Sequence, residues 1–320
     1  MAKIKLSIVV CTYNRAHLLR ETLCSILSQK TSFPYEVVVS DDCSTDETPT
    51  IISELSEKNP NIIVVNRLAN NIGLGGNWAS GILKAQGEYI AFLDDDDFWI
   101  DDRRMQIMAD YMDAHTDVDV LYTNAVEWFE RSGKRKQMGF PPSDQLDVHE
   151  MWKGKQKCIS MDVVMMRKST IEKHIKLEDY IKYRFPIQDW NTNILLLGNK
   201  ARYAFLDMPT CVIRITDGSM SRSKTYEEVE KKYAKEKVMY KYIADQFPND
   251  PIIRHDDKGF DAYVNHVLLS VAYKRGDYGK AKYYSKQYGG QTLQCRCART
   301  WVSFHLFRMA KMLIQKFRGA

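Results

Sequence analysis

The chain has 320 residues, of which 44% are hydrophobic and 27% charged, and its formal net charge is +5. These proportions are those of a soluble globular protein and argue against a disordered, fibrous or multi-span membrane chain. The length favours one large domain and a smaller second part. We predict a first domain over residues 1–224, with halves 1–125 and 126–224, and a helical extension over residues 225–320.

Two absences bear on where the protein works. The N-terminal apolar run ends at Tyr13-Asn14-Arg15 without a small-residue cleavage site, which argues against a signal peptide. No stretch approaches the roughly 20 apolar residues that cross a bilayer. We therefore expect a cytoplasmic protein whose membrane contact is at most peripheral. The seven cysteines lack paired C-x-x-C spacing, so reduced thiols are expected, with a redox or lipidation site at Cys295 and Cys297 as the alternative.

Strand-like and helix-like segments alternate along the first half of the chain. Short apolar runs predict strands at 6–11, 35–39, 62–65, 89–93 and 118–123, and apolar residues at helical spacing predict helices at 16–29, 48–55, 78–85 and 103–114. Continuous apolar strands are typical of a parallel sheet covered on both faces. The sequence therefore predicts an α/β fold, followed beyond residue 223 by helices rich in Lys, Glu, Tyr and Ala.

Four consecutive aspartates, Asp94 to Asp97, follow the apolar run 89–93. In an open α/β sheet the carboxyl ends of the strands form the ligand crevice, and clustered carboxylates repel one another unless a cation neutralises them. Oxygen ligands suit Mg²⁺ or Mn²⁺, which commonly bridge carboxylates to substrate phosphates. The alternative is a solvated acidic turn or a helix N-cap.

A second acidic pair, Asp41-Asp42, ends another predicted parallel strand and should face the same crevice. A carboxylate there accepts hydrogen bonds from a nucleobase or a ribose. Phosphorylatable aspartates of a receiver-like fold, or simple turn chemistry, are the alternatives. The segment from Asn70 to Asn77 is rich in glycine and predicts a flexible loop against which a ligand can lie.

Together these segments resemble the family 2 glycosyltransferases of the GT-A fold. The matching segments are Leu6-Ser-Ile-Val-Val-Cys-Thr-Tyr-Asn-Arg15, Val38-Val-Ser-Asp-Asp-Cys-Ser-Thr-Asp46, Asn71-Ile-Gly-Leu-Gly-Gly-Asn77 and Gly87-Glu-Tyr-Ile-Ala-Phe-Leu-Asp-Asp-Asp-Asp97. They occur in the family's order, and the resemblance covers about residues 4–222. It implies a Rossmann-like, mainly parallel sheet flanked by helices, and a nucleotide-diphosphate sugar as the donor.

The resemblance also implies roles for individual residues. Thr12, Tyr13 and Asp42 would contact the nucleoside, and the whole donor-binding set would be Thr12, Tyr13, Arg15, Asp41, Asp42, Asn71, Gly73, Asn77, Asp94 and Asp95. Asp94 and Asp96 would form the metal-binding D-x-D motif, with Asp96 as the direct ligand of Mg²⁺ or Mn²⁺. Asp95 and Asp96 can exchange roles, because the register within four equivalent residues is open.

Phe185-Pro-Ile-Gln-Asp-Trp190 resembles the family's acidic pair at a helix start, with Gln188 in place of the first acid. Asp189 would then be the catalytic base, and a helix N-cap is the alternative. The stretch from Val212 to Arg222 resembles the loop that closes the family's active site, although Thr216 stands where many members have histidine. In this region Arg214, Arg222 and Lys224 would either face the diphosphate or serve as surface charges.

The end of the chain is basic and amphipathic. From Cys295 to Ala320 there are six Lys or Arg and no acid, and in the last 20 residues large apolar side chains alternate with cations, as expected of an amphipathic helix. Such a helix would lie on an anionic membrane, or would pack on the domain or on a second subunit of a homo-oligomer. The excess charge is local, so we expect no nucleic-acid partner.

We expect an inverting, metal-dependent glycosyltransferase that acts on a saccharide or lipid-linked saccharide acceptor in bacterial surface polysaccharide biosynthesis. A sugar-nucleotide nucleotidyltransferase is the first rival, but the segment from Cys11 to Arg15 lacks its usual glycine-rich loop. A non-catalytic nucleotide-sugar-binding protein is the second, and Gln188 and Thr216 keep it open, because function resides in the site and not in the fold.

Overall fold

The computed structural model describes residues 3–216, 225–290, 292–300, 302–307 and 309. The chain divides into two compact units, Met1–Asp217 with Ile243–Ile253, and Gly218–Tyr242 with Arg254–Ala320. The division at residue 224 stays a prediction. The return of a short segment to the first unit is a feature that the composition of the chain does not indicate.

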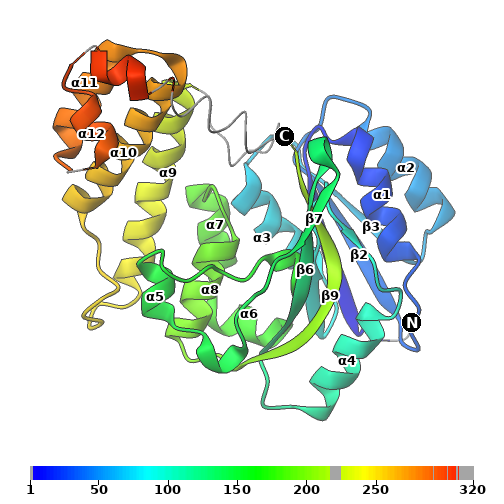
Figure 1. Cartoon of the computed structure of the whole chain (residues 1–320). Coiled ribbons are helices and arrows are strands. Elements are labelled where there is room, and N and C mark those ends of the chain that lie inside the picture. The colour runs from blue at the N-terminus through cyan, green and yellow to red at the C-terminus, as the bar shows by residue number, and fades with distance from the viewer. Residues whose placement is uncertain (1–2, 217–224, 291, 301, 308, 310–320) are drawn as a thin grey trace. The chain divides into compact units, whose positions relative to one another are not determined.

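A mixed sheet forms the centre of the first unit (Figure 1). Its described strands are β1 Leu6–Thr12, β2 Tyr35–Asp41, β3 Ile63–Arg67, β4 Tyr89–Phe92, β5 Phe98–Trp99, β6 Val120–Phe129, β7 Lys134–Gln137, β8 Val164–Arg167 and β9 Tyr203–Ile215. They lie in the order β3-β2-β1-β4-β8-β6-β9-β5, and β7 pairs with β6.

The strands β3, β2, β1 and β4 are all parallel. Leu6, Ile8, Val9 and Val10 of β1 are almost completely buried, because helices cover both faces of this half of the sheet. This burial explains why the strands read as unbroken apolar runs. Parallel strands end at one edge, so the segments that follow β1, β2 and β4 are neighbours.

The second half of the sheet adds antiparallel pairs. β8 runs antiparallel to both β4 and β6, whereas β6 and β9 are parallel. The α/β class is confirmed, but the reversal at β8 is not visible in the apolar pattern, which is the same for either strand direction. The polar stretch 134–144 contains the edge strand β7, whose four residues are all exposed.

The helices of the first unit are α1 Ala16–Leu27, α2 Thr48–Lys58, α3 Leu74–Lys84, α4 Arg104–Ala114, α5 Val148–Trp152, α6 Lys168–His174, α7 Leu177–Tyr183 and α8 Asp189–Gly198. Figure 1 shows α1 and α2 on one side of the sheet and α3 on the other. This arrangement follows from right-handed crossovers that reverse direction between β3 and β4. Short 3₁₀ turns lie at Glu130–Ser132, Ser143–Gln145 and Met161–Val163.

The glycines after Asn71 do not form the flexible loop that we expected. Only Gly73 has a positive φ, +82°, and α3 begins at Leu74. A Cβ on Gly75 would lie 2.5 Å from the carbonyl oxygen of Phe185, and one on Gly81 would lie 2.6 Å from the side chain of Val9. Glycine therefore lets this helix approach its neighbours closely.

Helices make up the described part of the second unit, which contains most of α9 Tyr226–Asp245 together with α10 Asp257–Arg275, α11 Tyr278–Tyr288 and α12 Leu293–Cys297. The turn between α10 and α11 joins them as a helical hairpin, with Gly276 at φ +75°. Of the predicted terminal helix, only residues 302–307 and 309 are described, and they are helical. No helix in the described part of the chain combines the length and the apolar character that a bilayer crossing requires.

Candidate active site

The aspartate run forms a turn directly after β4. The amide of Asp97 donates to the carbonyl of Asp94 at 3.1 Å, and β5 starts at the next residue. Asp162, from the 3₁₀ turn before β8, accepts a hydrogen bond from the Asp94 amide at 2.7 Å. One carboxylate oxygen from each of Asp94, Asp97 and Asp162 lies within 4.8 Å of the other two. We call these three residues the acidic triad.

The acidic triad carries negative charge that is poorly compensated. Burial raises the pKa of Asp94 well above its ordinary range, and the charges of Asp162, Asp189, Asp97 and Asp96 raise it further. Burial also raises the pKa values of Asp97 and Asp162, with smaller contributions from neighbouring carboxylates. Oxygen ligands held close together against their own repulsion fit a divalent ion such as Mg²⁺ or Mn²⁺.

Asp162 is held in place through its main chain as well as its side chain. Its carbonyl accepts hydrogen bonds from Arg104 Nη2 at 3.1 Å and Trp99 Nε1 at 3.3 Å, and its carboxylate accepts one from the Ser160 hydroxyl at 2.6 Å. The sequence prediction missed Asp162 and assigned Asp97 no role. The available signal was a single acid inside the apolar stretch from Ile159 to Met166.

Asp96 and Asp95 lie outside the acidic triad. Asp96 Oδ2 lies 3.6 Å from Arg15 Nη1, and both side chains are 22% exposed. Its predicted role as the direct metal ligand stays a prediction. Burial raises the pKa of Asp95 to about 7, and Asp96 adds to the rise, whereas the Thr12 hydroxyl and the Arg15 guanidinium oppose it.

Arg214, in β9, contacts the aspartate turn and not open solvent. Its amide donates to Asp97 Oδ1 at 2.7 Å and its Nε to the Asp96 carbonyl at 2.9 Å. Its guanidinium also pairs with Glu21 and, at 3.4 Å, with Glu130, and only 6% of the side chain is exposed. The alternative of a surface charge does not fit this position, and the diphosphate contact stays a prediction. Arg222 and Lys224 lie outside the described residues.

Asp189 is the first residue of α8. Its Oδ1 is buried and, among the described residues, has no hydrogen-bond partner. Burial raises the pKa of Asp189 to about 7, the charge of Asp162 adds to the rise, and a bond from the Met161 amide opposes it. A buried acceptor without a donor, and with a pKa near neutrality, is suited to receive a proton. As an N-cap it would have bonded helix amides, and Gln188 occupies that position instead.

The acidic pair after β2 has two different settings. Asp41 is completely buried, and its carboxylate accepts a bond from the Ser44 amide at 3.0 Å and lies 3.5 Å from Arg67 Nε. Asp42 accepts bonds from the amides of Ile72 and Gly73 at 2.7 and 2.9 Å. Asp41 therefore stabilises its own turn, and Asp42 anchors the segment before α3.

The remaining predicted donor contacts also separate by exposure. Tyr13 is 46% exposed, and Asn71 is exposed too, whereas Thr12 is buried at the end of β1. Asn77 is buried, and its amide group bonds with the Ser40 hydroxyl at 2.6 Å and the Ser40 carbonyl at 2.8 Å. Because its polar atoms bond within the protein, we propose no donor contact for Asn77.

The acidic turns and Asp189 share one neighbourhood. Cys11 lies in β1, and the pKa of its thiol is raised first by burial and then by the charges of Asp94, Asp95 and Asp42. The charge of Asp189 acts on Asp94 in the same way. The edge of the sheet therefore brings the predicted metal, nucleoside and base residues together, as the topology β2-β1-β4 requires.

Residues 7–175 match the family model described as glycosyl transferase family 2, which is more than half of the chain. The chain belongs to this family. The match begins in β1 and includes the aspartate turn and Asp162, whereas Asp189 lies beyond it.

The relatives of this family 2 chain align with it over only part of their length. An uncharacterised protein of Mycobacterium tuberculosis is 34% identical over 137 residues, which is 43% of this chain and 39% of the relative. The poly(ribitol-phosphate) beta-N-acetylglucosaminyltransferase TarS of Staphylococcus aureus is 38% identical over 115 residues, 35% of this chain and 19% of TarS. The chain thus aligns with less than half the length of these relatives.

Solved structures share the fold over almost the whole chain. Residues 1–349 of TarS from S. aureus, in complex with UDP-GlcNAc, superpose with a TM-score of 0.59 at 19% identity, covering 98% of this chain and 92% of that structure. The mannosyltransferase PcManGT from Pyrobaculum calidifontis, in complex with GDP-Man and Mn²⁺, gives a TM-score of 0.53 at 16% identity, with coverage of 97% and 86%. At these identities the likeness is one of fold.

Proposed function

We propose that the protein is an inverting glycosyltransferase that moves a sugar from a nucleotide diphosphate to an acceptor hydroxyl. The observation that carries the proposal is the placement of Asp189 Oδ1, buried and without a partner among the described residues, beside the acidic triad. Membership of family 2 supports the reaction class. Because function depends on the residues of the site and not on the fold alone, substitution of each residue tests the proposal.

In this proposal the donor lies across the ends of β1, β2 and β4. Tyr13 and Asn71 are exposed at this edge and contact the nucleoside, while Thr12 and Asp42 shape the floor beneath it. Gly73 presents an open backbone, because nothing lies within 4 Å of the position of a Cβ there. The Arg15 guanidinium, 3.6 Å from Asp96, supplies a cation for the diphosphate.

A divalent ion, Mg²⁺ or Mn²⁺, fits the acidic triad. Asp96 lies in the same turn as Asp94 and Asp97. When bound, such an ion neutralises charge on a leaving diphosphate. Asp94 belongs both to the predicted D-x-D motif and to the acidic triad, so it is the ligand on which the two agree. Arg214 holds the main chain of the turn through the Asp96 carbonyl and the Asp97 carboxylate.

Asp189 acts as the base. Its carboxylate accepts the proton of an acceptor hydroxyl, whose oxygen then attacks the anomeric carbon from the face opposite the diphosphate, which inverts the configuration. A pKa of about 7 matches a group that must be ionised to act and then hold a proton. Asp162 supports this pKa through its charge.

The acceptor is a saccharide or lipid-linked saccharide of a bacterial surface polysaccharide, met at the inner face of the plasma membrane. Relatives support this class by their names, which include TarS and a GalNAc(5)-diNAcBac-PP-undecaprenol beta-1,3-glucosyltransferase of Campylobacter jejuni. The latter is 38% identical over 93 residues, or 29% of this chain.

A screen of nucleotide sugars for Mn²⁺-dependent hydrolysis tests the proposal. We expect slow hydrolysis of one donor by the full chain, its loss on chelation, and its loss in Asp189→Asn with donor binding retained. If the unaltered protein bound a donor but neither hydrolysed nor transferred it with any acceptor, it would be the non-catalytic sugar-nucleotide binder. Release of pyrophosphate from a nucleoside triphosphate would instead indicate nucleotidyl transfer.

A further inference from the structure

A helical segment near the end of the described chain exposes a row of apolar side chains. Residues 302–307 and 309 are helical, and Val302, Leu306 and Met309 are 61%, 58% and 49% exposed. Spacing of four and then three residues places the three side chains on one face of the helix. Leu293 of α12, 56% exposed, adds a further apolar side chain in the same unit.

The opposite face of this helix already has a partner. Phe304 is completely buried in the core of the second unit, with its ring 4.5 Å from that of Tyr273, and Phe307 lies 5.2 Å from Tyr273. The helix is therefore apolar on both faces, although the core needs only one. A helix of this kind is stable in water only at a cost, unless its second face is covered.

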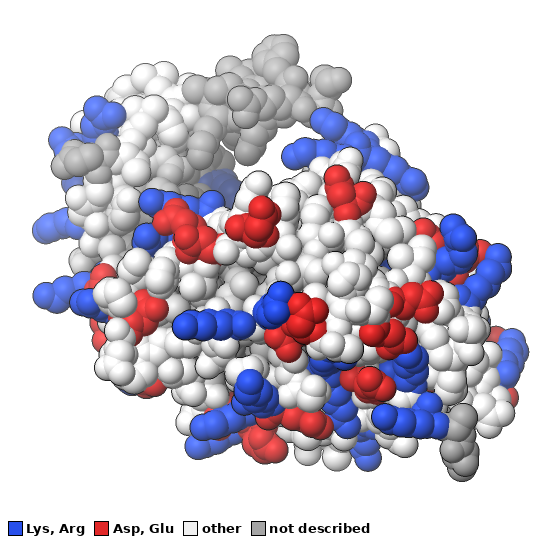
Figure 2. Space-filling view, turned by 90° about the horizontal axis from the view of Figure 1, so that it is seen from below, with Lys and Arg blue, Asp and Glu red and all other residues white. Residues whose placement is uncertain are grey.

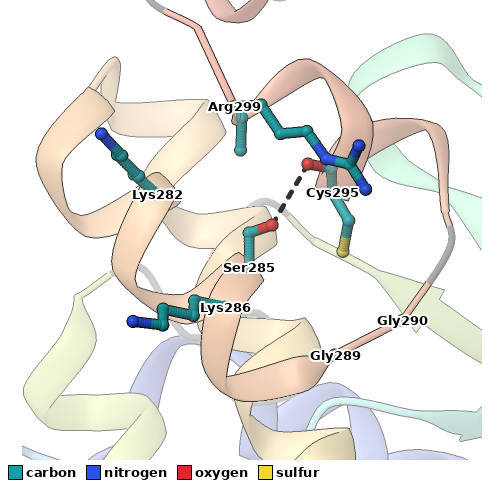
Figure 3. Close-up of a pocket in the computed structure, with 8 residues that line it drawn as sticks. Lys282, Ser285, Lys286, Gly289, Gly290, Cys295 and Arg299 are labelled. Atoms are coloured by element: carbon teal, nitrogen blue, oxygen red, sulfur yellow. Dashed lines mark hydrogen bonds between the residues drawn. The ribbon is translucent and has the colours of Figure 1, made fainter.

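Positive charge accompanies this exposed row. The sequence 278–320 contains nine Lys or Arg and no acid. Three of the cations, Lys282 and Lys286 of α11 and Arg299, line a pocket of about 340 Å³ together with Ser285, Gly289, Gly290, Cys295 and Ala298 (Figure 3). Arg299 precedes Val302 by three residues, so the pocket and the apolar row are continuous in the chain.

The cations around the pocket lack acidic partners among the described residues. Figure 3 shows both lysines extending outward from α11, while the Ser285 hydroxyl donates to the Cys295 carbonyl at 3.2 Å and ties α11 to α12. Figure 3 shows the ammonium groups of Lys282 and Lys286 on one side of α11 and the Arg299 guanidinium on the other, so the three residues line the pocket while the lysine charges extend away from it.

We propose that the second unit binds an anionic phospholipid bilayer through a surface that we call the cationic apolar face: Lys282, Lys286, Leu293, Arg299, Val302 and Leu306. The apolar side chains enter the interfacial layer, and the cations bind lipid phosphates. A mixed apolar and cationic surface with no acid fits an anionic bilayer, because the apolar side chains contact the acyl chains and the cations contact the lipid phosphates. If the acceptor is lipid-linked, as in the proposed function, this contact would bring the enzyme to it. Binding to the bilayer itself does not depend on sugar transfer.

Co-sedimentation of the full chain with vesicles tests this surface. We expect tighter binding to vesicles of phosphatidylcholine and phosphatidylglycerol at 70:30 than to phosphatidylcholine alone, by about tenfold or more. Lys282→Ala with Lys286→Ala should weaken binding to the anionic vesicles about 25-fold, since each cation contributes about fivefold. Val302→Ser with Leu306→Ser should weaken it while leaving its salt dependence unchanged.

Two control variants match these changes elsewhere in the same unit. Lys274→Ala removes an exposed cation from α10, and Val238→Ser removes an apolar side chain of α9 that is 47% exposed. Each should change vesicle binding less than twofold. Equal losses in the controls, or no preference for anionic vesicles, would overturn the proposal.

Light scattering tests the main alternative, that this face joins two copies of the chain. If the Val302 and Leu306 variant converted a dimer to a monomer in light scattering while vesicle binding stayed unchanged, the face would join two copies of the chain, and the lipid proposal would fail. Vesicle binding without turnover of any donor would leave this inference standing and defeat only the proposed function.

Discussion

The acidic triad of the first unit and the cationic apolar face of the second bear opposite charges, and they differ most in their access to water. Asp97 and Asp162 are almost completely buried, so the pKa values of their carboxyls rise. Lys282, Lys286 and Arg299 are exposed. Charge buried at one point suits one small ion, whereas charge spread in solvent suits an extended surface and is screened by salt.

Asp189→Asn should have the largest effect on the acidic side of this comparison. Loss of a general base typically lowers the rate 10²- to 10⁴-fold, so we expect a fall in kcat of about that size with donor affinity unchanged. Steady-state kinetics under saturating donor would measure it. Asp144→Asn, at an exposed acid outside the acidic triad, should retain full activity; a similar fall there, or none in Asp189→Asn, contradicts the assignment.

Replacing Asp162 and Asp96 one at a time should show which carboxylates bind the metal. Asp162→Asn should weaken Mn²⁺ binding by about 10- to 100-fold, because it removes a carboxylate from the acidic triad. Calorimetric titration of the apoprotein would report the affinity. Asp96→Asn provides the comparison: a larger loss there than in Asp162→Asn would favour the D-x-D assignment made from the sequence over the acidic triad.

Arg214→Lys should lower kcat/KM by about tenfold, corresponding to about 1.4 kcal/mol of transition-state stabilisation. Lysine keeps the charge but cannot make the several bonds that the guanidinium makes to Glu21, Glu130 and the Asp96 carbonyl. Parallel Mn²⁺ titrations would separate the two possible roles. Weaker metal binding is expected for a residue that positions the turn, and unchanged metal binding with a raised donor KM would instead indicate a direct diphosphate contact.

Salt should distinguish the two regions directly. Raising NaCl from 50 to 500 mM shortens the screening length severalfold, so binding to anionic vesicles should weaken by about tenfold or more. Mn²⁺ binding to the acidic triad, in which Asp97 and Asp162 are buried, should change by less than about threefold. Equal sensitivity in the two titrations would remove the distinction based on water access.

The smallest expected effect is on stability. The pKa of Asp189 is about 7 in the folded protein, above the value near 3.9 of an unfolded aspartate. The folded state therefore loses stability as pH rises from about 4 to 7, because the buried carboxyl must ionise. Asp189→Asn escapes this loss and should be more stable than the unaltered protein at pH 8, by about 1 kcal/mol or more, and equally stable at pH 4. Chemical denaturation at both pH values would show whether the difference has this sign.

The apolar pattern of the sequence predicts the first half of the sheet and the edge at which its parallel strands end. Buried parallel strands must be apolar on both faces, so β1, β2, β3 and β4 were visible as uninterrupted runs, and the polar residues that end them marked the ligand edge. Asp42, Asp94 and Asp189 were predicted in this way or through the family resemblance, and their roles stay predictions.

The contacts between side chains from distant segments depend on the tertiary structure. Asp162 joins Asp94 across 68 residues of chain, and Arg214 reaches the same turn from β9. Neither contact has a local sequence signal, because a hydrogen bond between distant segments depends on strand order and direction. The same reason explains why the glycines after Gly73 form a closely packed helix, and why the side-chain amide of Asn77 bonds with Ser40.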